Sequence, residues 1–289
     1  MTSLPPRPFE LCLVGAGKAG TAVASALAGA GHRVAGVASR TESSARDAAA
    51  LLGAPATAVE DLPRCDVVVL GVPDAAVPAV GAVVAAGAAP GTVVWHLAGA
   101  LGVDALPGDG RVLRCAAHPV QAFPDRSGRA PLAGCSWGLT CDEAIGDWAR
   151  TVVGEDLRGN AVDVREEDRP VWHAAAVTTA NGITALLSLA ETLLGSIGVA
   201  DTTRVLGPLA ASAVANSLSR GPSASLTGPA VRGEWATVAA HVQAIGAGAP
   251  YLLEPYLEAT RLIFRAAERA GMVTDEARVA AASILGEAR

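Results

Sequence analysis

The feature that most constrains this chain is a short apolar run leading straight into a glycine pattern near the N-terminus. Leu11 to Val14 is followed by Gly15-Ala16-Gly17-Lys18-Ala19-Gly20 and then by a helix-compatible segment, Thr21 to Ala30. In such a strand–turn–helix unit, the first glycine permits the tight turn and the second lets the backbone approach phosphates. The third lets the helix pack closely on the strand, and the helix N-terminus faces the anion. Residues 15–20 therefore predict a dinucleotide-binding loop.

The end of the second expected strand indicates which dinucleotide is bound. NAD enzymes usually carry an acidic residue there to hold the ribose 2′-hydroxyl. This chain reads Ala38-Ser39-Arg40-Thr41 and has no carboxylate until Glu42. Arg40 can pair with a 2′-phosphate, and the hydroxyls of Ser39 and Thr41 can donate hydrogen bonds to it. The sequence thus predicts NADP(H), the alternative being that Arg40 is a solvated loop arginine.

Strand-like and helix-like segments alternate through the first half, which is typical of a doubly wound parallel sheet with crossover helices. The expected strands are residues 11–14, 33–37, 66–70, 92–97, 111–116 and 137–140, with a further one near Leu157. Ligands of open parallel sheets bind beyond the carboxyl ends of the strands. The segments expected to converge there are the Gly15 loop, Ser39–Arg40, Val72–Pro73, His96–Gly99 and His118–Gln121. Val72 and Pro73 are accordingly counted among the cofactor contacts.

Strand signals disappear after about Asp163, and helical patterns dominate from there on. The expected helices are residues 165–197, 202–217 (capped by Asp201), 231–245, 251–270 and 274–286. We therefore expect two domains: a nucleotide-binding α/β domain over residues 1–163 and an all-α domain over residues 164–289.

Charge and cysteine content exclude several function classes. The net charge of −6 gives no basic surface for nucleic acid. The five cysteines form no CxxC pair, so neither a metal site nor a disulfide framework is expected. No signal-peptide layout is present, and no uninterrupted apolar stretch of the roughly 20 residues needed to span a membrane is recognised. The sequence thus predicts a cytoplasmic protein without a membrane or nucleic-acid partner.

Further motifs connect the two expected domains. They are His96-Leu97-Ala98-Gly99-Ala100-Leu101-Gly102, His118-Pro119-Val120-Gln121-Ala122-Phe123, His173-Ala174-Ala175-Ala176 before Asn181, and Leu226-Thr227-Gly228-Pro229-Ala230-Val231-Arg232-Gly233. With the Gly15–Gly20 loop, these motifs span nearly the whole chain. Together they resemble the two-domain Rossmann-like NAD(P)-binding oxidoreductases whose C-terminal helical domain is a domain of unknown function.

The wider layout is similar to pyrroline-carboxylate reductase, ketopantoate reductase and the β-hydroxyacid dehydrogenases. The resemblance implies a Rossmann domain followed by a helical domain like the C-terminal domain of 6-phosphogluconate dehydrogenase. It also implies a substrate held between the nicotinamide and the helical domain, and reduction of C=O or C=N in a small carboxylate. Because such relatives often pair through the helical domain, and because its helices are apolar on more than one face, we expect a homodimer.

One departure from these relatives affects the chemistry. The β-hydroxyacid and ketopantoate enzymes use a lysine four residues before an asparagine on the long interdomain helix. Here Val177 stands four residues before Asn181, and the chain's only lysine, Lys18, lies in the glycine loop. A histidine is then the expected proton donor, because its pKa lies near the working pH.

Two of the five histidines are the best candidates for that role. His118 lies at an expected strand end, and His173 lies eight residues before Asn181, about 80° away around a helix. We therefore predict His118, His173 and Asn181 as catalytic residues, although each histidine could also be structural. His96 lies at another strand end and is predicted to contact substrate. The other two, His32 and His241, are expected to be a surface residue and a core or surface residue, respectively.

The motif around Thr227 suggests an anchor for a substrate carboxylate. Thr227-Gly228-Pro229 precedes an expected helix whose free N–H groups, together with Arg232, could hold an anion. The alternative is a simple helix cap with a surface arginine. The combined hypothesis is NADPH-dependent reduction of a ketopantoate-like ketoacid. A cyclic imine such as pyrroline carboxylate is the second possibility, and a non-catalytic NADP-binding sensor or partner protein is the third.

Overall fold

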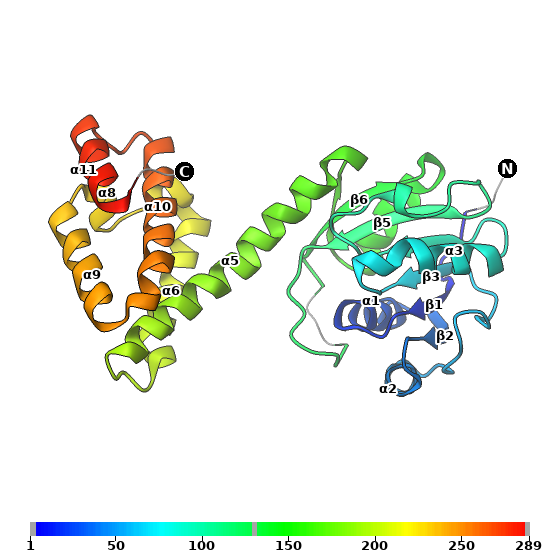
Figure 1. Cartoon of the computed structure of the whole chain (residues 1–289). Coiled ribbons are helices and arrows are strands. Elements are labelled where there is room, and N and C mark those ends of the chain that lie inside the picture. The colour runs from blue at the N-terminus through cyan, green and yellow to red at the C-terminus, as the bar shows by residue number, and fades with distance from the viewer. Residues whose placement is uncertain (1–3, 129–131, 287–289) are drawn as a thin grey trace. The chain divides into compact units, whose positions relative to one another are not determined.

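The chain folds into two units, which are described separately (Figure 1). The computed structural model describes residues 4–128 and 132–286. The first unit comprises Met1–Thr178 and the second Thr179–Arg289. The division falls inside one long helix, α5 (Arg169–Ser196), whereas residue 163, the boundary expected from the sequence, coincides with the end of the last strand.

A seven-stranded sheet in the order β2-β1-β3-β4-β5-β6-β7 forms the centre of the first unit. The strands are β1 (Glu10–Val14), β2 (Arg33–Ala38), β3 (Val67–Leu70), β4 (Val93–His96), β5 (Leu113–Pro119), β6 (Ser136–Cys141) and β7 (Asn160–Asp163). Neighbouring strands from β2 to β5 run parallel, whereas β6 runs antiparallel to β5 and β7 runs parallel to β6. This confirms the predicted Rossmann class. The strand expected near Leu157 instead begins at Asn160, because Leu157 is buried at the end of a helical segment.

Helices cover both faces of this sheet, which explains why its strands read as continuous apolar runs. Leu11 and Leu13 of β1 face one buried cluster, and Cys12 and Val14 face the other. The first cluster includes residues of α1 (Lys18–Gly29), α2 (Glu42–Leu52) and α4 (Gly146–Thr151), and the second includes residues of α3 (Val77–Gly87). Burial on both faces leaves the strand ends as the part of the sheet that a ligand can reach.

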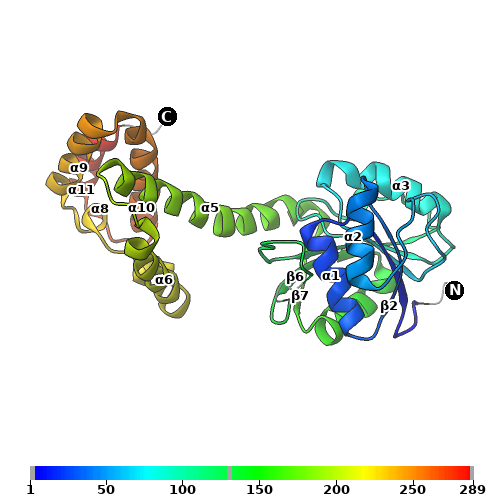
Figure 2. The same cartoon turned by 90° about the horizontal axis from the view of Figure 1, so that it is seen from below.

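The second unit is helical, as predicted. After α5 come α6 (Thr202–Arg220), α7 (Pro222–Ser225), α8 (Pro229–Arg232), α9 (Trp235–Gly248), α10 (Leu253–Arg269) and α11 (Asp275–Leu285). Figure 2 shows α8 to α11 gathered together, and their shared core contains Trp235, Val238 and Phe264. Asp201 caps α6 by accepting the Arg204 N–H at 3.0 Å, as expected. The helix predicted over residues 231–245 is divided, because Gly233 takes a left-handed conformation (φ +72°) between α8 and α9.

One segment, residues 166–196, is long and apolar enough to cross a membrane by length and composition, although no such segment was predicted from the sequence. It consists of a short 3-10 turn, Glu166–Asp168, followed by α5. The apolar residues are interrupted by polar ones, among them His173 and Asn181, so no uninterrupted run stands out in the sequence. None of its most apolar window is buried within the chain.

Candidate functional site

The glycine loop adopts the geometry that a dinucleotide pyrophosphate requires. Gly15 has φ +98°, and its N–H donates to the Ala38 carbonyl at 2.8 Å. A Cβ atom on Gly15 would lie 2.6 Å from the carbonyl carbon of Gly71, and one on Gly20 would lie 2.6 Å from the Gly15 oxygen. These three glycines therefore pack backbone against backbone, and α1 begins directly above them with Gly17 as its N-cap. No side chain caps the helix, which leaves its first N–H groups for an anion.

The side chains predicted to meet a 2′-phosphate follow β2. Ser39 is partly buried, and its hydroxyl accepts the Ala16 N–H at 3.4 Å. Arg40 is exposed at the strand end. Thr41 is already engaged, because it caps α2 by accepting the Ser44 N–H at 3.3 Å. The Glu42 carboxylate pairs with Arg46 one turn along α2. Of the predicted residues, Arg40 is the one whose charge remains available to an anion.

The segment that follows β3 lies beside the glycine loop. Val72 and Pro73 follow β3, and a Val72 methyl group lies 2.8 Å from the position of a Cβ on Gly15. Val72 thus lies against the glycine loop of residues 15–20, and its contact with a cofactor stays a prediction. Because β1, β3, β4 and β5 are parallel neighbours, the loops after them share one edge of the sheet, as predicted.

His96 is not available to a substrate, contrary to expectation. Its side chain is fully buried at the end of β4. Its Nε2 lies 2.9 Å from the Gly102 carbonyl oxygen, and its Nδ1 accepts the Ala98 N–H at 3.3 Å. This pairing fixes the neutral Nε2–H tautomer. Burial lowers the pKa of His96 to about 4, and Arg169 adds to the effect. The imidazole therefore holds the loop after β4 in place. This structural role replaces the contact with substrate that was predicted for His96.

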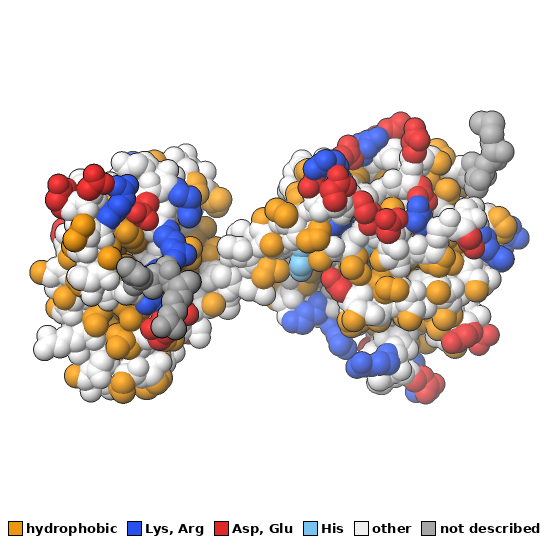
Figure 3. Space-filling view, turned by 45° about the horizontal axis from the view of Figure 1, so that its top comes forward, with side chains coloured by type: hydrophobic (Ala, Val, Ile, Leu, Met, Phe, Trp, Pro, Cys, Tyr) orange, Lys and Arg blue, Asp and Glu red, His pale blue; other side chains and the backbone are white. Residues whose placement is uncertain are grey.

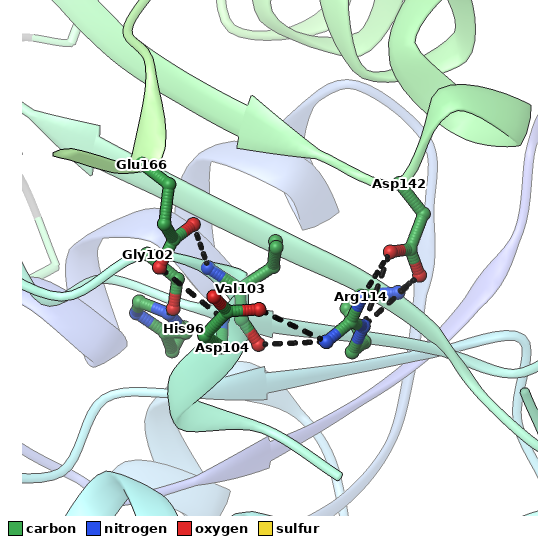
Figure 4. Close-up of polar contacts among 7 residues, drawn as sticks. All are labelled: His96, Gly102, Val103, Asp104, Arg114, Asp142 and Glu166. Atoms are coloured by element: carbon green, nitrogen blue, oxygen red, sulfur yellow. Dashed lines mark hydrogen bonds and ion pairs between the residues drawn. The ribbon is translucent and has the colours of Figure 1, made fainter. Parts of the chain in front are cut away.

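The loop after β4 is also held by contacts with the segment that precedes α5 (Figure 4). The Glu166 carboxylate accepts the N–H groups of Val103 (2.9 Å) and Asp104 (3.3 Å). It occupies the space above Gly102, where a Cβ atom would lie 2.0 Å from a carboxylate oxygen. Arg114 pairs with Asp142 at 2.9 Å and with Asp104 at 3.6 Å. These contacts tie the loop after β4 to β5 and β6.

Arg169, the first residue of α5, is a fully buried cation. Its guanidinium donates to three backbone carbonyls: Ala98 at 2.6 Å, Gly138 at 2.9 Å and Ala116 at 3.4 Å. Burial lowers the pKa of Arg169. A buried charge is costly unless it is hydrogen-bonded. Arg169 therefore fixes the start of α5 against β5, β6 and the loop after β4.

The two candidate catalytic histidines meet at this point. The rings of His118, near the end of β5, and His173, on the second turn of α5, lie edge to face with centroids 5.3 Å apart. His173 rests on Gly99, where a Cβ atom would lie 2.1 Å from its Nδ1. That buried nitrogen has no hydrogen-bond partner among the described residues. Trp172 donates its indole N–H to His118 Nδ1 at 3.1 Å. Burial, His173 and Arg169 together lower the pKa of His118 to about 4.

The other predicted site residues belong to the second unit. Asn181 is exposed on α5. Arg232 pairs with Glu234 at 2.7 Å and donates to the Thr227 hydroxyl at 3.2 Å. Gly228, with φ +109°, precedes α8, which is only four residues long and begins with a proline. The structure thus joins Thr227 to Arg232, but the free helix N-terminus expected there is a single turn.

Two further histidines have structural surroundings. His32, expected at the surface, is buried: it stacks on Phe9 and accepts the Phe9 N–H at 3.1 Å. Its Nε2 lies 3.1 Å from an Asp156 carboxylate oxygen. The reason is that residues preceding β2 pack under the chain entering β1. His241 lies 2.8 Å from the Tyr256 hydroxyl on the exposed surface of the second unit.

Four residues of this region were not predicted from the sequence: Arg169, Trp172, Glu166 and Gly71. A signal existed for Arg169, because it stands four residues before His173 and so shares its helix face. Gly71 directly follows a valine-rich strand, as the loop glycines do. Trp172 and Glu166 gave no local signal, because their partners lie more than fifty positions away in the sequence.

Comparison with protein families agrees with this architecture. Residues 2–119 match a Rossmann-like domain, and residues 135–263 match a domain of unknown function, DUF2520. The chain carries a Rossmann-like domain followed by a DUF2520 domain. This confirms the resemblance noted from the sequence motifs. A comparison with curated proteins finds no significant match.

Solved structures share the whole two-domain fold. A candidate NADP oxidoreductase from Bacteroides fragilis is 23% identical over 89% of this chain and 98% of its own, with a TM-score of 0.78. A reductive aminase from Aspergillus terreus, in complex with NADPH and ethyl-5-oxohexanoate, is 17% identical over 94% and 98%, with a TM-score of 0.62. Pyrroline carboxylate reductase from Plasmodium falciparum, with NADP bound, is 14% identical over 96% and 98%, with a TM-score of 0.57. At these identities, the likeness concerns the fold.

Proposed function

We propose that the protein is an NADP(H)-dependent oxidoreductase that reduces a carbon–nitrogen double bond in a small carboxylate-bearing substrate. The observation that carries the proposal is the meeting of His118 and His173 at the sheet edge that also bears the Gly15–Gly20 cradle. In open α/β sheets this edge is where a cofactor and its substrate bind. The solved relatives that bind NADP or NADPH on the same fold support the choice of cofactor.

The residues present fit such a dinucleotide. Its pyrophosphate would lie on the backbone of residues 15–17 and at the N-terminus of α1, where a side chain on Gly15 would collide with Gly71. Arg40 would hold the 2′-phosphate of NADP, because the first carboxylate after β2, Glu42, already pairs with Arg46 instead of being left to hold a ribose hydroxyl. When bound, the nicotinamide supplies the hydride.

The state of His118 favours an imine over a ketone. Reduction of a ketone makes an alkoxide that must receive a proton, and a cationic imidazole is a suitable donor. With its pKa lowered to about 4, mainly by burial, His118 is neutral at pH 7 and has no such proton to give. An iminium substrate arrives already protonated on nitrogen. Among the solved relatives, a pyrroline carboxylate reductase and a reductive aminase share the fold.

The decisive experiment is NADPH oxidation measured against matched cyclic imine and ketoacid substrates. We expect turnover with a pyrroline-type carboxylate, and a kcat that is largely kept while KM rises in a His118→Ala/His173→Ala double variant that still binds NADPH. Turnover with ketopantoate alone, abolished in the double variant, would instead support the ketoacid reaction that the sequence first suggested. NADPH binding without turnover of either substrate would support the third candidate, a non-catalytic NADP-binding protein.

A further inference from the structure

Trp172 and His118 are joined by a hydrogen bond that crosses from α5 to β5. The indole Nε1–H donates to His118 Nδ1 at 3.1 Å. The two residues are 54 positions apart in the sequence, so the contact depends entirely on how α5 begins over the sheet. Three residues earlier, the Arg169 guanidinium fixes that beginning by donating to the Ala98, Ala116 and Gly138 carbonyls. The indole is thus presented to His118 by a rigid anchor.

A glycine on β6 makes room for this contact. Gly138 is the register partner of His118 across the β5–β6 ladder. A Cβ atom on Gly138 would lie 2.6 Å from both Nε1 and Cε2 of Trp172. The indole therefore lies directly on the bare backbone of β6, beside the imidazole, and any larger residue at position 138 would displace it.

The chemistry of the two rings makes the contact directional. An indole nitrogen is a donor only, whereas each nitrogen of a neutral imidazole is either a donor or an acceptor. His118 Nδ1 must therefore keep a lone pair toward Trp172, and the single ring proton must reside on Nε2. A doubly protonated imidazole would set two N–H groups against each other.

We propose that Trp172 is a positioning residue that fixes His118 as its neutral Nε2–H tautomer, so that His118 presents one hydrogen-bond donor to an oxygen of the substrate. The proposal rests on the proposed function and adds to it the atom that His118 uses. An iminium nitrogen has no lone pair to accept this bond. The oxygen that accepts it is therefore one of the substrate carboxylate.

The charged and titratable groups around His118 also favour its neutral form. His173 and the Arg169 guanidinium face it from α5, and β6 contributes the backbone of Gly138. Burial, His173 and Arg169 lower the pKa of His118 to about 4. The bond from Trp172 adds a directional constraint to this electrostatic one, because it determines which nitrogen holds the proton.

The test is nitrogen NMR of histidine side chains in the full chain labelled with ¹⁵N-histidine. At pH 7 we expect His118 to show a protonated Nε2 and an unprotonated Nδ1. In Trp172→Phe, which keeps an aromatic ring but lacks the N–H, we expect a mixture of tautomers and a His118 pKa that moves upward toward its ordinary value. Trp148→Phe is the matched control: its Nε1 has no partner in the described chain, and it should leave the His118 signals unchanged.

Three results would overturn the proposal. They are an Nδ1–H tautomer of His118 in the unaltered protein, an unchanged tautomer and pKa in Trp172→Phe, and equal responses in Trp172→Phe and Trp148→Phe. The tautomer of His118 is measured in the unaltered protein, so this part of the test does not depend on the folding of a variant. Because the readout needs no substrate, it stays valid if the reductase activity is absent. In an active enzyme, Trp172→Phe should raise KM for the carboxylate substrate more than it lowers kcat.

Discussion

The histidine at the end of β4 has a structural role because it is buried. His96 is fully buried with both ring nitrogens bonded to backbone groups, while His118, one strand further, stays partly exposed beside His173. Both residues look alike in the sequence, since each follows an apolar run and precedes a loop. They differ because the loop after β4 folds back and places the Gly102 carbonyl against His96. Such a contact cannot be read from local spacing.

The buried state of His96 predicts a loss of stability in acid. Its pKa is about 4 in the folded protein and about 6.5 in the unfolded chain, so the unfolded state binds more protons between these values. The free energy of unfolding should therefore fall as the pH falls from 6.5 to 4, with His96 contributing about 3 kcal/mol of that loss. Denaturant unfolding at pH 7 and pH 4.5 would measure it. His96→Gln should be less stable at pH 7 but show a flatter pH dependence. Equal slopes in both proteins would contradict this.

Cofactor choice depends on one exposed arginine. Arg40→Ala should weaken NADPH binding and leave NADH binding nearly unchanged, because only NADPH carries the 2′-phosphate. A charge-assisted pair contributes roughly 1.5–3 kcal/mol, or about ten- to a hundredfold in Kd. Fluorescence titration with both nucleotides would measure the effect. Arg33→Ala is the control, since Arg33 lies at the opposite end of β2, where it pairs with Glu10. Equal affinity of the unaltered protein for NADPH and NADH would refute the role of Arg40.

Among the elements, the β1–α1 unit was the most predictable from sequence and is also the most tightly constrained. Gly20→Ala would place a Cβ atom 2.6 Å from the Gly15 oxygen and 3.0 Å from Gly71 Cα. We expect it to cost about 1–3 kcal/mol of stability and to abolish NADPH binding, because the backbone of the loop must move. Gly29→Ala, at the other end of α1, meets nothing within 4 Å and should preserve both properties. Thermal unfolding with and without NADPH would compare the two variants, and normal binding by Gly20→Ala would contradict the cradle geometry.

The elements that sequence reasoning placed well have strong local signals. The valine-rich strands, the glycine loop and the Asp201 cap of α6 all lie within a residue or two of their predicted positions. The division of the helix at Gly233 was not predicted, and the last strand was expected near Leu157 rather than at β7 (Asn160–Asp163), each for a physical reason. Gly233 lies inside an otherwise helix-compatible run, and β7 is a short edge strand whose residues are mostly exposed. Exposed edges lack the apolar pattern on which strand prediction depends.

At the scale of the whole molecule, α6 suggests that a second copy covers the helical unit. None of its residues is buried, although Val205, Leu209, Val214 and Leu218 are large and apolar. Figure 3 shows apolar side chains spread over the exposed surface of this unit, among smaller groups of charged ones. A helix that is apolar on more than one face requires burial against other helices. We therefore propose a homodimer formed through the second unit.

Light scattering at micromolar concentration would test this assembly. The expected mass is twice that of the chain, and Leu209→Glu combined with Leu218→Glu should shift it toward the monomer, because carboxylates would replace apolar contacts. Leu51→Glu, at a half-exposed position on α2 of the first unit, is the matched control and should keep the dimer. A monomeric mass for the unaltered protein would contradict the proposal.

The central claim, hydride transfer from NADPH to a carbon–nitrogen double bond, has one direct measurement. The protein is incubated with a cyclic imine carboxylate, such as pyrroline carboxylate, and NADPH deuterated at the hydride-donating position of the nicotinamide. We predict a reduced amine one mass unit heavier, with the label on the former imine carbon, formed in step with NADPH oxidation and faster than with NADH. Bound NADPH that is never oxidised, or label that appears only in the alcohol formed from a ketoacid, would contradict it.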